Sequence, residues 1–192
     1  MPDSRRLCGP PPLLVPVGVL PHDQWRLAGG DGPLAYKLDA QAGRALWHLG
    51  ALLTFKALGE ETGGQFWALE GLADRHMAVP LHAHSREEEI WYVLEGEIVF
   101  TIGDETLTAG PGSFAYIPRN VPHTFQVCSD TARWFGFGVP AGLDRWFFET
   151  GMPAEALTLP PPPSSPPDVA AIVASLQAYG TATERGINRT LL

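Results

Sequence analysis

The stretch PLHAHSREEEIWYVLEGE, residues 80–97, decides how the chain folds and indicates what it binds. It places His82 and His84 two positions apart on an extended run, and Glu89 follows at the start of an apolar segment. Alternate side chains of a β-strand point to the same face. The two imidazoles can therefore reach one metal ion together, which makes this stretch a candidate metal site.

A second stretch, GPGSFAYIPRNVPHTF at residues 110–125, adds a third histidine, His123. With Glu89 it would complete a set of three histidines and one carboxylate. Such a set suits one divalent transition metal ion, Fe, Mn, Ni, Co, Cu or Zn, and the order of affinities does not choose among them. Four protein ligands on an octahedral ion leave two positions open, as a catalytic site requires. The alternative interpretation is that these histidines are buried polar residues of a barrel.

The composition indicates a globular, acidic protein with one core. The chain has 192 residues, of which 45% are hydrophobic and 18% charged, and its formal net charge is −8. Phosphate binding needs a cationic surface, so this charge argues against nucleic acid as a partner. Two cysteines, Cys8 and Cys128, form no CxxC pair, which fits a reducing cytoplasm. No apolar stretch approaches the length of a membrane span, so we expect a cytoplasmic protein without a membrane partner.

Strand signals dominate residues 44–139. Short apolar runs, among them 45–58 and 66–72, alternate with turn signals, and no helical segment separates them. This pattern predicts an antiparallel sandwich or barrel. We assign residues 35–140 to this β-barrel and residues 1–34 to an N-terminal arm.

The C-terminal part, residues 141–192, is predicted to be a helical segment with a proline-rich spacer. One helix is expected over residues 142–150. Asp168 is a candidate N-cap for a second helix that stops at Gly180. We expect residues 181–192 to be frayed.

The two stretches resemble the two signature motifs of the cupin superfamily. The first motif has the form HxH, four residues, Glu, six residues, Gly, and it is carried here by His82, His84, Glu89 and Gly96. The second motif is carried by Gly112, Pro118, Asn120, His123 and Val127. The flanking segments, residues 50–72 and 141–160, resemble those of single-cupin bacterial proteins of the quercetin 2,3-dioxygenase-like group, so the resemblance covers roughly residues 35–180.

Two positions depart from the second motif. Asn120 stands where the motif has Gly, and Asn tolerates a left-handed backbone better than other non-glycine residues, so the turn is expected to survive. Val127 replaces an Asn that is not a metal ligand. In the first motif, the spacing to Gly96 selects Glu89 as the carboxylate, and Glu87 is expected to be solvated.

The resemblance implies an all-β fold, the cupin double-stranded β-helix or jelly-roll barrel, with short C-terminal helices. It also implies a metal-dependent dioxygenase that cleaves a flavonol such as quercetin, or a related enolic aromatic substrate, and releases carbon monoxide. The metal would be held by His82, His84, Glu89 and His123, and Glu89 would also act as the catalytic base. The partners that the resemblance implies are a small-molecule substrate, O2 and a second copy of the chain in a homodimer.

Two other functions would use the same residues. A non-redox cyclase or isomerase of secondary metabolism would use the metal as a Lewis acid and would not need oxygen. A sensor or storage protein would bind a small molecule without turnover, although the complete ligand set exceeds what a binder requires. The fold alone does not choose among these functions.

Four aromatic residues are predicted to share the face of the ligands and to line a substrate pocket: Trp91, Phe114, Tyr116 and Phe125. The alternative interpretation is that each of them belongs to the barrel core. Among the remaining histidines, His76 could face the same cavity, whereas His22 and His48 are expected at the surface or at a cap.

Overall fold

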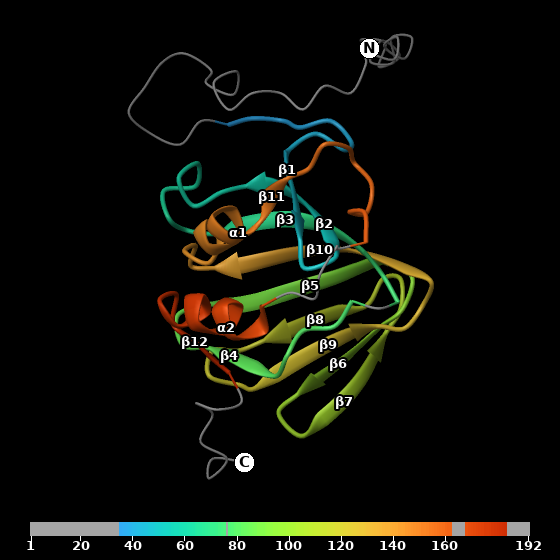
Figure 1. Cartoon of the computed structure of the whole chain (residues 1–192), viewed down its shortest axis with the longest axis vertical. Helices are drawn as coiled ribbons and strands as arrows, with labels where there is room; N and C mark the ends of the chain where they lie inside the picture. The colour runs from blue at the N-terminus through green and yellow to red at the C-terminus, as the bar shows by residue number, and fades with distance from the viewer. Residues whose placement is uncertain (1–34, 76, 163–167, 184–192) are drawn as a thin grey trace, which may run out of the picture.

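The computed structural model of the chain describes residues 35–75, 77–162 and 168–183. The described residues form two antiparallel sheets that pack against each other, with helices at one side (Figure 1). This architecture confirms the predicted all-β, jelly-roll class. The predicted N-terminal arm, His22, His76, part of the proline-rich spacer and the last nine residues lie outside the described residues.

The larger sheet has seven strands in the order β11-β1-β2-β3-β10-β5-β8. Their bounds are β1 (Arg44–His48), β2 (Ala51–Ala57), β3 (Trp67–Asp74), β5 (Glu88–Glu95), β8 (Phe114–Ile117), β10 (Thr131–Val139) and β11 (Met152–Pro153). The smaller sheet has five strands in the order β12-β4-β9-β6-β7. Their bounds are β4 (His82–His84), β6 (Ile98–Ile102), β7 (Glu105–Ala109), β9 (His123–Val127) and β12 (Thr181–Thr183).

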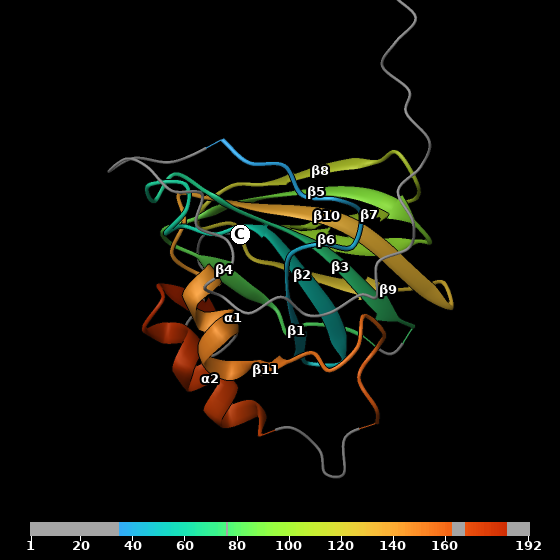
Figure 2. The ribbon, with the colours of Figure 1, turned by 90° about the horizontal axis from the view of Figure 1, so that it is seen from above.

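Two helices, α1 (Asp144–Thr150) and α2 (Val169–Gln177), lie side by side at one side of the barrel (Figure 2). The side chain of Asp168 accepts a hydrogen bond from the amide of Ala171 at 3.0 Å, which confirms the predicted N-cap of α2. No helix within the described ranges is long and apolar enough to cross a membrane.

The apolar run at residues 45–58 forms two strands instead of one. Leu49 and Gly50 have φ values of 49° and 87°, and they form the tight turn between β1 and β2. Two successive positive φ values match the twist of a two-residue hairpin. The sequence does not indicate this turn, because its first position is occupied by Leu, which rarely adopts a positive φ.

In the core, the indole ring of Trp134, on β10, packs directly against Gly71 of β3. These residues are register partners, and the Trp134 side chain is only 2% exposed. A Cβ atom at Gly71 would lie 2.2 Å from the indole ring of Trp134. The glycine is therefore required by the neighbouring ring, since native interiors leave no room for an added methyl group.

We expect Gly71→Ala to lower the free energy of unfolding by about 1–3 kcal/mol, the usual cost of overpacking a core. Urea denaturation measures the change. Gly136→Ala is the matched control, because its Cβ would lie 3.6 Å from the nearest heavy atom, an ordinary contact. An equal loss of stability in the two variants would contradict the packing explanation.

Candidate metal centre

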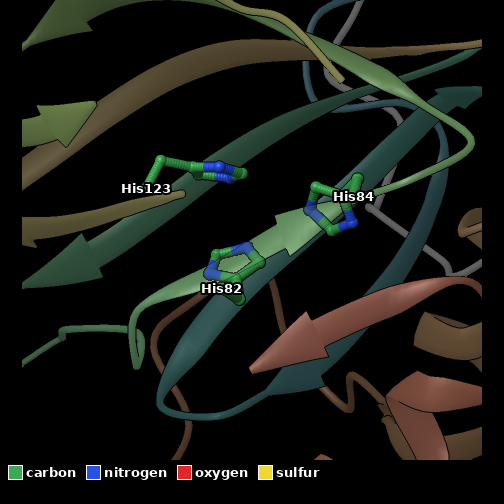
Figure 3. Close-up of side chains that lie close together, drawn as sticks. All are labelled: His82, His84 and His123. Carbon is green, nitrogen blue, oxygen red and sulfur yellow. The ribbon is translucent and has the colours of Figure 1, made fainter. Parts of the chain in front are cut away.

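Three histidines from two neighbouring strands face one another (Figure 3). His82 and His84 lie on β4, and His123 begins β9 as the register partner of His82. The ligand atoms of the three side chains all lie within 4.8 Å of one another. The i, i+2 spacing places two rings on one face of β4, and the strand pairing brings the third ring beside them.

The imidazoles of His82 and His123 are oriented by backbone carbonyls two residues earlier in the chain. His82 Nδ1 lies 2.8 Å from the oxygen of Pro80, and His123 Nδ1 lies 3.0 Å from the oxygen of Val121. A carbonyl oxygen only accepts hydrogen bonds, so each Nδ1 carries a hydrogen, and in the neutral ring that binds a metal the lone pair lies on Nε2. Ring orientation of this kind is typical of metal-binding histidines.

The Nε2 atoms of His84 and His123 are buried without a hydrogen-bond partner among the described residues. Buried polar atoms are nearly always satisfied, and one left unpaired costs about 1–3 kcal/mol. A metal ion between these atoms would satisfy both of them. The donor set and its unpaired nitrogens therefore fit a transition metal ion.

Glu89, on β5, supplies a carboxylate beside two of these rings. Its side chain is buried, with Oε1 3.3 Å from His84 Nε2 and Oε2 3.7 Å from His123 Nε2. The indole N–H of Trp91 donates a hydrogen bond to Oε2 at 3.2 Å. Burial acts to raise the pKa of Glu89, but His84 and His123 outweigh it and hold that pKa well below its usual range. The carboxylate is therefore ionised.

The histidines differ in their electrostatic surroundings. Burial, together with His123 and His84, lowers the pKa of His82 to about 3, so this ring is neutral at neutral pH. Burial also lowers the pKa of His84, but Glu89 outweighs burial and leaves that pKa raised. A metal ligand must be neutral imidazole, so binding at His84 competes with its protonation.

Of the four predicted pocket aromatics, Trp91 and Phe125 lie inside the barrel. They are 9% and 7% exposed, and their ring centroids are 4.6 Å apart. Trp91 also stacks on Trp134 with a centroid separation of 5.1 Å. Both residues belong to the hydrophobic core.

The prediction for Phe114 and Tyr116 is wrong, because both point to the outer face of the sheet. Their side chains are 65% and 47% exposed. In the register between β5 and β8, Ala115 pairs with Trp91 and Ile117 pairs with Glu89. The odd-numbered positions of β8 therefore face the interior, and Phe114 and Tyr116 occupy the other face.

Two buried residues near the centre were not found by sequence reasoning. Glu87, expected to be solvated, is 4% exposed, and its Oε1 accepts a hydrogen bond from the amide of Leu143. Burial raises the pKa of Glu87 to about 7. Thr181, expected in a frayed tail, is 2% exposed, and its Oγ1 lies 2.9 Å from His84 Nδ1. Both contacts join segments far apart in the chain, so no local pattern indicates them.

Comparisons of the sequence with known proteins agree on one family. The model of the cupin domain matches residues 69–135. The chain is 26% identical over 135 residues to quercetin 2,3-dioxygenase of Bacillus subtilis, an alignment that covers 70% of this chain and 40% of that protein. It is 32% identical over 76 residues to the uncharacterized protein SCO3923 of Streptomyces coelicolor, with 34% of this chain and 71% of that protein covered.

The structure of KdgF from Halomonas sp. superposes with a TM-score of 0.51 at 17% sequence identity. The match covers 58% of this chain and 97% of that one. Similarity at this level of identity shows the shared fold and nothing of the chemistry.

Proposed function

This chain belongs to the cupin superfamily, and on that premise we propose that it is a metal-dependent dioxygenase acting on a flavonol or a related enolic aromatic compound. The observation that carries the proposal is the convergence of three imidazoles and the ionised, buried carboxylate of Glu89. The similarity to the Bacillus quercetin 2,3-dioxygenase supports the substrate class. This chain spans only 40% of that protein's length, so the substrate and activity of this chain are proposals.

His82, His84, His123 and Glu89 would hold the ion. When bound, a divalent transition metal supplies Lewis acidity toward the hydroxyl of the substrate. Glu89 would accept the proton of that hydroxyl at Oε1, since Oε2 already accepts the Trp91 N–H. The aromatic side chains of Trp91 and Phe125 would keep water away from the reacting groups.

The proposal includes a homodimer. Tyr92, Phe114 and Tyr116 are exposed large side chains on the outer face of β5 and β8, and they offer apolar surface for a second copy. Sedimentation velocity of the full chain tests this point, and a monomer at micromolar concentration would contradict it.

The decisive experiment follows flavonol loss by absorbance with protein loaded separately with Fe, Mn, Ni, Co, Cu and Zn. Each reaction runs with and without oxygen, beside a His123→Ala control. We expect oxygen-dependent loss with at least one metal and none in the variant. Loss that continues without oxygen would replace the dioxygenase with a non-redox cyclase or isomerase. No loss with any bound metal would contradict the proposed substrate class.

A further inference from the structure

We propose that the C-terminal segment of residues 168–183, formed by α2 and β12, is part of the metal centre, and that Thr181 is a positioning residue for His84. The inference rests on the proposed metal centre and assigns a role to a segment outside both motifs. Its central observation is the contact between Thr181 Oγ1 and His84 Nδ1 at 2.9 Å, which spans 97 residues of the chain.

β12 is the main backbone neighbour of the strand that carries two of the histidines. It pairs with β4 in antiparallel register, with Thr181 opposite His84 and Thr183 opposite His82. On its other side, β4 shares a single residue pair with β9. The C-terminal strand therefore contributes to the placement of both β4 histidines, beside the strand that carries His123.

Hydrogen bonds to the residue after β4 and to α1 hold this segment in place. The amide and the hydroxyl of Ser85 both donate to the oxygen of Gly180, at 2.9 and 2.8 Å. The indole N–H of Trp146, in α1, donates to Ser175 Oγ in α2 at 2.8 Å. Gly180 has a φ of 79°, and a Cβ there would lie 2.7 Å from the Ser85 hydroxyl, so the close approach requires glycine.

The hydroxyl of Thr181 is chemically unlike the partners of the other two rings. His82 and His123 face carbonyl oxygens, which only accept, whereas a hydroxyl can accept or donate. When Thr181 accepts from His84 Nδ1–H, His84 Nε2 keeps its lone pair for a metal. When Thr181 donates to Nδ1, the hydrogen lies on Nε2 and faces Glu89 Oε1 at 3.3 Å. The hydrogen bond between Thr181 and His84 can therefore form both with and without a bound metal, with the donor and acceptor exchanged.

Thr181→Val tests this role because it removes the hydroxyl at nearly constant volume and leaves His84 Nδ1 buried without its partner. We expect the variant to bind Zn²⁺ about 10–100-fold more weakly, the usual effect of losing a hydrogen bond behind a metal ligand. Thr181→Ser keeps the hydroxyl and should recover most of the affinity. Affinity is measured by competition with a chromophoric chelator, and circular dichroism checks the fold.

Thr183→Val is the matched control. Thr183 lies on the same strand and is buried like Thr181, but it pairs with His82, whose Nδ1 already bonds to Pro80. We expect this control to bind Zn²⁺ as tightly as the parent. Parent-like binding by Thr181→Val, or an equal loss in Thr183→Val, would overturn the inference. If the parent itself binds none of the metals, the proposed metal centre fails with it.

Long-range ¹H–¹⁵N NMR of the unmodified protein gives a second test that does not depend on a variant folding. With Zn²⁺ bound, the hydrogen of His84 is expected on Nδ1. Coordination through His84 Nδ1 would overturn the role of Thr181 while leaving metal binding itself intact.

Discussion

The Glu89→Gln variant is expected to keep its fold and to bind a divalent transition metal at least about 100-fold more weakly than the parent. Loss of groups behind the ligands typically costs 10–100-fold in affinity, and a proposed ligand should cost no less. Glutamine has nearly the volume of glutamate, and its amide oxygen can still accept the Trp91 N–H. The variant removes the negative charge that lies 3.3 Å from His84 Nε2 and 3.7 Å from His123 Nε2, and it replaces one carboxylate oxygen with an NH2 group.

Isothermal titration with Zn²⁺ measures the effect, and thermal unfolding confirms that the variant is folded. Glu88→Gln is the matched control: it neutralises the neighbouring carboxylate, which forms an ion pair with Arg119 instead of facing the histidines. An affinity unchanged by Glu89→Gln would remove Glu89 from the ligand set. An equal loss in both variants would indicate a general effect of charge.

Acid is expected to destabilise the metal-free protein through His48, far from the motifs. This ring is 6% exposed and packs edge-on against Trp146 and Phe147, with centroid separations of 4.7 and 5.2 Å. Burial lowers the pKa of His48 to about 4, whereas an exposed histidine titrates near 6.5. Between pH 6.5 and about 4, His48 is therefore protonated in the unfolded chain but remains neutral in the folded protein.

The sign of the effect follows from the depressed pKa of His48. Its contribution is fully present above pH 6.5, falls as the pH drops toward about 4, and is constant below that. At about 1.4 kcal/mol per pH unit, the total loss is about 3 kcal/mol. Urea unfolding at about pH 7 and about pH 4.5 in the presence of a chelator should show most of this loss.

His48→Gln should lose less stability than the parent between these two pH values, whatever its stability at neutral pH. Comparing the two proteins isolates His48, because every other titratable group is the same in both. An identical pH dependence in parent and variant would show that His48 is not the source.

The sequence indicates local features of the centre well and distant ones poorly. The spacing of His82 and His84 predicts a shared face, because strand periodicity involves neighbouring residues only. The left-handed backbone of Asn120, with a φ of 64°, was likewise predicted from its residue type. Thr181 lies 97 residues from His84, and nothing in the segment after Gly180 indicates the strand it pairs with.

Strand register accounts for another part of what the sequence could not show. Phe114 and Tyr116 were predicted to line the pocket because they were expected to share the face of the ligands. Whether they face inward depends on which residues of β8 pair with β5, and a shift by one residue exchanges the two faces. Glu87 was expected to be solvated and His48 to lie at the surface or at a cap, but tertiary packing buries both of them.

β4 itself shares one residue pair with β9, and the residues just before β4 add backbone hydrogen bonds from Val79 to Phe125 and from Val127 to Met77. On the proposed function, an ion held by His82, His84, His123 and Glu89 would tie β4 and β9 of the smaller sheet to β5 of the larger sheet. It would act there as a reversible cross-link and stabilise the fold by closing loops of the chain, much as a disulfide does. Amide hydrogen exchange along β4 would report this cross-link, because exchange should be slower with the ion bound than after chelation.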